Sequence, residues 1–297
     1  MTTDRTARTG LLLGIGAYIS WGILPLYLKL LKGVPALQVL AHRILWSLLL
    51  LAVVVLIARR GRAILAAARG RTLLLLCASA TLIAINWLVY IWSVQNNHVL
   101  EASLGYFINP LINVALGVAL LGERIRRGQA LAVGIAALGV LVLTISGGGA
   151  IWISLALALS FAFYGLVRKV AAIDALGGLT VETLLLAAPA LAVLFHASAN
   201  GTAAFGADRH LDLLLILAGA VTAAPLLMFA AAARRLRYAT LGLLQYLAPT
   251  LQFAQAVLLF GEPLRPVHII TFALIWTGCA LYAIDSVRGS RTPVTAE

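Results

Sequence analysis

Charge is scarce in this sequence, and acidic charge is the scarcer kind. Only 11% of the 297 residues are charged, with 10 acidic residues against 22 basic ones. With 62% hydrophobic residues and a mean hydropathy of +1.02, the chain has too little polar surface to cover a globular exterior in water. The composition therefore predicts a membrane protein.

Cysteine is nearly absent, and the sequence signatures of enzymes are missing. Cys77 and Cys279 each lie in an apolar run, where no disulfide framework or metal-ligand spacing surrounds them. The chain has no His-Glu-x-x-His, no phosphate loop, no paired-aspartate metal motif and no Gly-x-Ser-x-Gly elbow. We therefore expect no metal, no cofactor and no enzymatic activity.

The net charge of +12 raises the question of a nucleic-acid partner. The Arg and Lys residues, however, occupy short connections between apolar runs and do not share one face studded with aromatic residues. The sequence thus indicates no nucleic acid. Residues 1–9 are polar and precede an apolar run without a small-residue cleavage site, so we also expect no removable signal peptide.

Ten apolar runs are present, each close to the roughly 20 residues that cross a bilayer. We predict an all-α membrane protein of ten transmembrane helices with a short basic helix at 59–71 on the lipid headgroups. The predicted spans are 10–31, 36–58, 72–95, 100–121, 128–146, 150–168, 177–198, 211–233, 239–260 and 266–285.

The chain repeats itself with a shift of 139 residues. This shift places Pro110 on Pro249, Asn113 on Gln252, Gly122 on Gly261 and Glu123 on Glu262. Each copy holds five spans, an odd number, so the second copy must be inverted. We predict inverted five-helix repeats at 1–146 and 147–297 that form one structural unit, an arrangement typical of alternating-access transporters.

Basic residues in the short loops predict the orientation. The N-terminus, the loops at 59–71, 124–127, 168–169 and 234–237, and the C-terminus together carry 17 of the 22 Lys and Arg residues. Basic loops face the cytoplasm in most membrane proteins. We therefore expect both termini to be cytoplasmic.

Polar side chains inside apolar spans are costly and so are candidate site residues. In the first copy they could line an outward-facing cavity, although hydrogen bonds between helices, worth about 0.6 kcal/mol each, are the alternative. Arg43 stands out because a guanidinium so deep in a span needs a carboxylate, backbone carbonyls, water or an anionic substrate. The candidates are Trp21, His42, Arg43, Asn86, Tyr90, Tyr106 and Asn109.

In the second copy the candidates are Glu182, Gln245 and Gln252, on the side of an inward-facing cavity. Glu182 is the best intramembrane carboxylate for proton coupling, and the alternative is a structural bond to a hydroxyl or to the basic pair 168–169. For the two glutamines, side-chain packing is an equal alternative.

Two glycine and two proline positions match across the repeat. Pro110 and Pro249 would each remove an interior backbone hydrogen bond and act as hinges. Gly122 and Gly261 are expected to end helices in the left-handed conformation, with the following glutamates in a structural role.

Twelve stretches of this sequence, among them 41–47 and 101–110, resemble the RarD group of EamA-type permeases within the drug/metabolite transporter (DMT) superfamily. The similarity covers nearly the whole chain outside the tails and residues 199–210. One residue departs from the group's pattern: Gln38 stands where we expect a Glu. The resembling stretches are 17–18, 21–22, 25–29, 34–35, 41–47, 86–87, 101–110, 122–124, 161–169, 182–183, 240–246 and 249–250.

The resemblance implies ten helices in two inverted halves, a cytoplasmic-membrane location, and export or exchange of small organic solutes. We therefore predict a secondary transporter that works by alternating access. The alternatives are a lipid-handling protein, either flippase or intramembrane enzyme, and a membrane regulator that transports nothing. The substrate, its direction, the coupling ion and the oligomeric state, including a homodimer, are left open.

Overall fold

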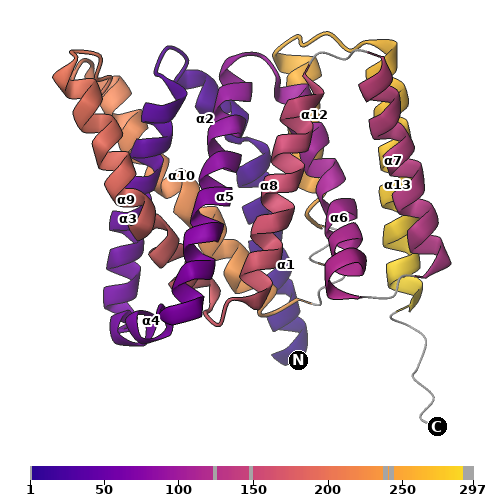
Figure 1. Ribbon diagram of the computed structural model, residues 1–297, viewed down its shortest axis with the longest axis horizontal. Helices are drawn as coiled ribbons and strands as arrows, with labels where there is room; N and C mark the ends of the chain where they lie inside the picture. The colour runs from indigo at the N-terminus through magenta and orange to yellow at the C-terminus, as the bar shows by residue number, and fades with distance from the viewer. Residues whose placement is uncertain (1, 123–125, 147–149, 237–239, 241–243, 290–297) are drawn as a thin grey trace.

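The computed structural model describes residues 2–122, 126–146, 150–236, 240 and 244–289, and every regular element in them is a helix (Figure 1). Nine of the described helices are long and apolar enough to cross a membrane, so the protein is a multi-pass helical membrane protein. The elements are α1 Thr2–Gly22, α2 Leu24–Leu30, α3 Ala36–Ile57, α4 Gly61–Ala67, α5 Gly70–Gln95, α6 Val99–Leu121, α7 Arg127–Ile145, α8 Ile151–Val170, α9 Ala175–Ala199, α10 Arg209–Ala233, α12 Leu247–Ala254, the π-helical segment η1 Gln255–Leu259, and α13 Pro266–Gly289.

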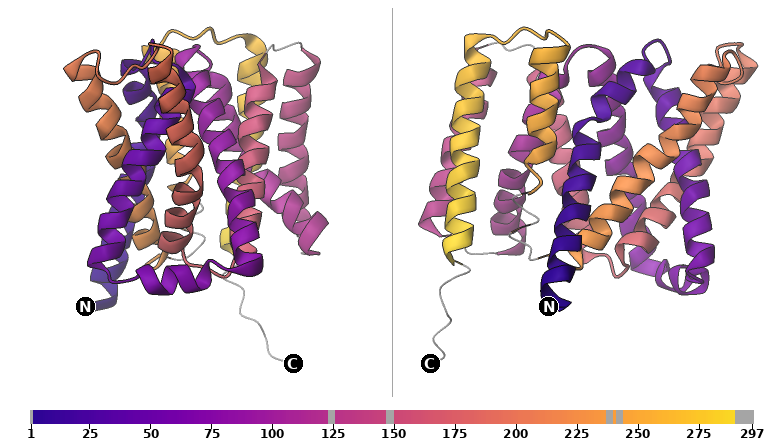
Figure 2. Two further views of the ribbon diagram at one scale, coloured as in Figure 1. Left: turned by 60° about the vertical axis from the view of Figure 1, so that its left-hand side comes forward. Right: turned by 180° about the vertical axis from the view of Figure 1, so that it is seen from behind.

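The long helices stand side by side and alternate in direction (Figures 1 and 2). We call the end at which α1 begins and α4 lies the amino-terminal face, and the other end the opposite face. α3 packs against α9 and α10, α8 packs against α5 and α6, and α1 packs against α10 and α12. α7 and α13 pack mainly against each other at one edge of the bundle.

Local signals mark two helix ends, as the sequence predicts, and one helix start. The backbone of Gly122 has φ 67° and that of Gly261 has φ 65°, the left-handed conformation expected of a glycine after a helix. Asp208 accepts hydrogen bonds from the amides of His210 and Leu211 at the start of α10. These two bonds, that from Leu211 first, hold the pKa of Asp208 below its ordinary value.

The ninth predicted span, 239–260, differs from the prediction. Thr240 and Leu244 are helical, but Gln245 and Tyr246 lie in a turn that interrupts the span, and helix α12 begins at Leu247. α12 and η1 together cover about 20 Å, less than the roughly 30 Å of a bilayer core. Pro249 is thus in the first turn of α12, where proline interrupts no hydrogen bond. Of the two prolines that match across the repeat, Pro110 has the predicted interior position, within α6, and Pro249 does not.

Candidate functional site

Arg43 lies deep in α3, seven residues or about 10 Å from the first residue of that helix. Its side chain is buried, and only 4% of the residue is exposed. Nε donates a hydrogen bond of 3.0 Å to the hydroxyl of Thr222 on α10. The guanidinium also lies over the Trp87 ring of α5, 5.2 Å from its centroid. Arg43 is therefore held between two other helices.

Asn86, Tyr90 and Tyr106 gather next to Arg43. The Tyr106 hydroxyl donates to Asn86 Oδ1 at 3.1 Å, and Asn86 Nδ2 donates to Ser160 Oγ of α8 at 3.0 Å. The Tyr90 and Tyr106 rings meet edge to face at 5.6 Å. Four predicted site residues thus come together, and we call them, with Trp87 and Thr222, the Arg43 cluster.

Three other predicted residues lie outside the Arg43 cluster. The His42 ring stacks on Phe205 at 5.3 Å, beside the segment that joins α9 to α10. Trp21 packs edge to face on Tyr18, with ring centroids 5.4 Å apart. Asn109 is buried in α6, and its Oδ1 has no hydrogen-bond partner. Neighbours in sequence on one helix point in different directions, so His42 and Arg43 face different surroundings.

The Arg43 cluster is closed in this structure. Arg43, Asn86 and Tyr90 are each at most 4% exposed, so the predicted outward-facing cavity is not open at these residues. Two buried side chains tie together segments on the opposite face. Gln38 bonds the segment between α9 and α10, and Glu262 accepts from the amides of Val99 and Leu100 at 2.9 and 2.7 Å.

The amide of Gln38 explains why this position suits Gln in this chain. Nε2 donates to the Thr202 carbonyl at 2.9 Å, while Oε1 accepts from the Ala204 amide at 3.0 Å. A carboxylate has no donor for the first of these bonds. We expect Gln38→Glu to lower the free energy of unfolding by about 1–3 kcal/mol at neutral pH, because the buried Thr202 carbonyl would lose its donor and face an anion.

This deficit should shrink as the pH falls, since protonated Glu regains a donor. Melting temperatures in detergent at neutral and mildly acidic pH measure it. Gln129→Glu is the control, because Gln129 Oε1 accepts from the Arg126 amide and a carboxylate keeps this acceptor. Equal melting of Gln38→Glu and wild type at neutral pH would contradict the argument.

Glu182 sits on α9 at the same depth as Arg43 but from the other face, again seven residues into its helix. It is 1% exposed, and Oε1 accepts from Ser79 Oγ at 2.6 Å. Tyr164 donates to Oε2 at 3.3 Å, and Arg168 Nε lies 3.6 Å from Oε1. The structural alternative for Glu182 is therefore present: two hydroxyls and Arg168 surround it, and it does not pair with Arg43.

Gln252 and Gln255 donate hydrogen bonds to the last carbonyls of α1, and Pro25 leaves one of these carbonyls without its usual donor. Proline has no amide hydrogen to give the carbonyl four residues earlier, which is that of Trp21. Gln252 Nε2 donates to this carbonyl at 3.0 Å, and Gln255 Nε2 donates to the Gly22 carbonyl at 2.7 Å. Gln252, a predicted residue of the inward-facing cavity, and Gln255 thus bond backbone carbonyls at the break between α1 and α2. Gln245 lies half-buried in the turn before α12.

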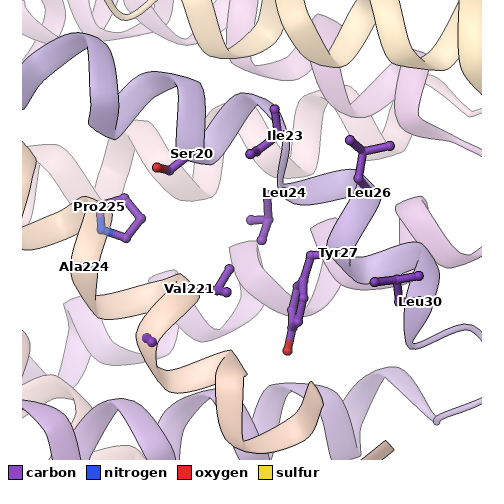
Figure 3. Close-up of a pocket in the computed structure, with 10 residues that line it drawn as sticks. Ser20, Ile23, Leu24, Leu26, Tyr27, Leu30, Val221, Ala224 and Pro225 are labelled. Atoms are coloured by element: carbon purple, nitrogen blue, oxygen red, sulfur yellow. The ribbon is translucent and has the colours of Figure 1, made fainter. Parts of the chain in front are cut away.

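A groove of about 600 Å³ opens between α1–α2 and α10. Figure 3 shows Ser20, Ile23 and Tyr27 on one wall and Val221 and Pro225 on the other. The hydroxyls of Ser20 and Tyr27 both donate to backbone carbonyls. The groove therefore presents an apolar surface, which suits lipid chains better than a polar headgroup and gives little support to a flippase.

Sequence reasoning missed several partners of the predicted residues. Thr222, Ser160 and Ser79 carry hydroxyls in long apolar spans, and no local pattern distinguishes them from other helix hydroxyls. The orphan carbonyl of Trp21 follows from Pro25 in the sequence, but its donor Gln252 is 231 residues away.

Comparison with known proteins decides the family. The profile of the EamA-like transporter family matches residues 8–145. Protein RarD of Escherichia coli is 46% identical over 289 residues, covering 97% of this chain and 98% of its own. The chain belongs to the EamA-like transporter family.

Two further relatives are similar over nearly the whole chain. An uncharacterized transporter of Pseudomonas aeruginosa is 49% identical over 287 residues, covering 96% of both chains. A chloramphenicol-sensitive protein RarD of the same species is 35% identical over 289 residues, again covering 96% of both. A solved crystal structure, 19% identical, has a TM-score of 0.63 over 95% of this chain and 99% of its own, which shows a common fold. The family is one of membrane transporters, and this assigns the chain to the membrane transporters.

Proposed function

We propose that this protein is a secondary transporter that moves small organic solutes across the cytoplasmic membrane by alternating access. The observation that carries the proposal is Arg43, a charged side chain buried at about one third of the bilayer's depth beside tyrosine and asparagine side chains. Ionisable groups at such depth mark substrate or ion pathways in membrane proteins. Membership in a transporter family supports the same reading.

Two inverted halves, residues 1–146 and 147–297, form the moving parts in this proposal. Equivalent helices begin 139 residues apart, which is the shift of the sequence repeat. α1 runs away from the amino-terminal face, whereas α8 runs toward it (Figure 1). The three pairs of helix starts are Ala36 and Ala175, Gly70 and Arg209, and Arg127 and Pro266.

The helix contacts support the inverted halves as well. Exchange of the halves turns α1 into α8, α3 into α9, α5 into α10, α6 into α12 and α7 into α13. The contact of α1 with α10 then becomes that of α8 with α5, and the contact of α1 with α12 becomes that of α8 with α6. Both members of each pair occur. Because matched packing can exchange between the halves, rocking could open the two faces in turn.

Transport in sealed proteoliposomes tests the proposed function. We expect saturable counterflow of at least one member of a panel of organic acids, amino acids, nucleobases and amphipathic drugs. Fluxes equal to those of protein-free liposomes for every solute, with folded protein in the membrane, would refute transport.

Glu262 closes the opposite face in this mechanism. Its buried carboxylate accepts from two amides at the start of α6, a helix of the other half. Glu262→Gln places an NH₂ donor against one of these amides, which weakens a charged hydrogen bond worth about 1.5–3 kcal/mol. We introduce a cysteine in place of Ser103, a fully buried position of α6. With Glu262→Gln, we expect this cysteine to react about tenfold faster with a membrane-impermeant maleimide than it does with Glu262 in place.

Cys77 and Cys279 are replaced beforehand so that only the new thiol reacts. Glu101→Gln is the matched control, since Glu101 lies on the same face but contacts His98 of its own segment. Labelling at the same rate in Glu262→Gln and Glu101→Gln would show that Glu262 does not hold this face closed.

The orientation and assembly belong to the same proposal. α1 begins and α13 ends on the amino-terminal face, and we assign this face to the cytoplasm because the basic segments 59–71 and 168–169 lie there. Proteolysis of sealed vesicles of known orientation tests the assignment. The partners in this proposal are the organic solute and the surrounding lipid bilayer. Mass measurement of the protein in detergent tests whether it forms a homodimer.

A further inference from the structure

Arg43 is a buried cation without an acidic neighbour. Nε donates to the neutral Thr222 hydroxyl, and Nη1 has no hydrogen-bond partner. The ion pairs found among the described residues are Arg60–Asp174, His98–Glu101 and Arg168–Glu182, and none of them includes Arg43. The positive charge of Arg43 is therefore not balanced by any carboxylate that the structure describes.

The groups that face Arg43 are neutral and come from four helices. The hydroxyls of Tyr27, Tyr90 and Tyr106 lie near enough to interact with its charge, and the Trp87 ring lies against the guanidinium. The Tyr90 hydroxyl is buried and, like Arg43 Nη1, has no partner. Two unused donors thus lie in one buried cluster, and both suit an acceptor with negative charge.

Burial of an unpaired guanidinium opposes folding, because its hydration is lost without a compensating charge. Arg168 shows the contrast within the same chain: it is also largely buried, but Glu182 lies 3.6 Å away. A charge kept at such a cost calls for a role that packing does not supply. A bound anion would complete the site, and guanidinium binds carboxylate and phosphate with two parallel hydrogen bonds.

We propose that the solute of this transporter is a small organic anion whose carboxylate or phosphate group binds Arg43 and the Tyr90 hydroxyl. The aromatic rings of Trp87 and Tyr106 form the walls of the site, and Phe161 extends them at 6.1 Å from Tyr106. The body of the anion is therefore flat and apolar or aromatic. This inference rests on the proposed transport function and adds the substrate class to it.

Thermal melting of the purified protein in detergent tests binding without any transport. The probes are phenylacetate, phenyl phosphate, the neutral phenylacetamide and the cationic phenethylamine. We expect one or both anions to raise the melting temperature, and the stronger of the two identifies the charged group. Equal shifts with the amide or the amine would overturn the proposal.

Arg43→Met separates binding from structure. It should abolish the anion-dependent shift and, by removing an unbalanced charge, leave the ligand-free melting temperature unchanged or higher. Arg168→Met is the matched control and should melt lower, because it leaves Glu182 unpaired. If Arg43→Met melts as low as Arg168→Met, or still responds to the anions, Arg43 is not the anion site.

Arg43→Lys keeps the charge, which secures the test if the methionine variant does not fold. Lysine lacks the planar fork, so we expect anion affinity to fall about tenfold or more while the fold is kept. Unchanged affinity would overturn the proposal. Anions that bind but are never transported would refute the transport function and leave the anion site standing. Transport of neutral solutes alone, unaffected by Arg43→Met, would refute the anion site and leave transport standing.

Discussion

Glu182→Leu is expected to destabilise the protein by about 3–5 kcal/mol, because it leaves the charge of Arg168 buried without its partner. Arg168 Nε lies 3.6 Å from Glu182 Oε1, its side chain is 15% exposed, and its Nη1 has no hydrogen-bond partner. Ser79 would lose the acceptor of its 2.6 Å hydrogen bond as well. Melting in detergent, with the folded fraction followed by circular dichroism, measures the loss.

The double variant Glu182→Leu with Arg168→Leu should recover much of that stability, since both charges are then removed together. A double-mutant cycle isolates the coupling between the two side chains. If the two single losses simply add, the carboxylate does not stabilise the buried guanidinium, and Glu182 is then free for a role in proton coupling.

Gly219→Ala is expected to separate α3 from α10 and to disturb the site at the same time. A Cβ at Gly219 would lie 2.5 Å from the Trp46 carbonyl carbon and 2.7 Å from its oxygen. Backbone atoms cannot rotate away, so the helices must move apart, at a cost of about 1–3 kcal/mol for alanine and more for valine. Thr222 lies three residues further along the same helix, so its bond to Arg43 should lengthen.

Melting temperature and transport rate should therefore both fall in Gly219→Ala. Gly134→Ala in α7 is the matched control, because a Cβ there meets nothing within 4 Å. Alanine is a better helix former than glycine, so this control should be neutral or slightly stabilising. Wild-type melting and transport in Gly219→Ala would show that α3 and α10 tolerate a wider separation than the structure has.

The helices were predictable because hydropathy and helix-ending signals are local properties of the chain. The predicted starts of α3 at residue 36 and α13 at residue 266 agree with the structure, and the glycines at 122 and 261 end their helices as expected. The prediction of one continuous helix was wrong for the ninth span. A turn at Gln245 and Tyr246 interrupts it, and beyond this turn Gln252 and Gln255 donate to carbonyls at the interruption of the first span.

The candidate site was predictable only in part. Arg43 and Asn86 are conspicuous in the sequence as polar residues in apolar spans, and the structure brings them into one cluster. His42, directly beside Arg43, instead stacks on Phe205. No periodic pattern could separate these cases, because the direction in which each side chain points depends on which helix lies next to it.

The sequence by itself determined that this protein is a helical membrane protein of the EamA-like family, with a charge at residue 43 that lipid alone could not accommodate. Those properties depend on the order of residues along short stretches. Only the tertiary structure decided that Arg43 donates a hydrogen bond to Thr222, 179 positions away. It also decided that Glu182 pairs with Arg168 and not with Arg43. Contacts between distant segments are settled by how helices pack, and side-chain volume and glycine contacts such as that of Gly219 with Trp46 determine that packing.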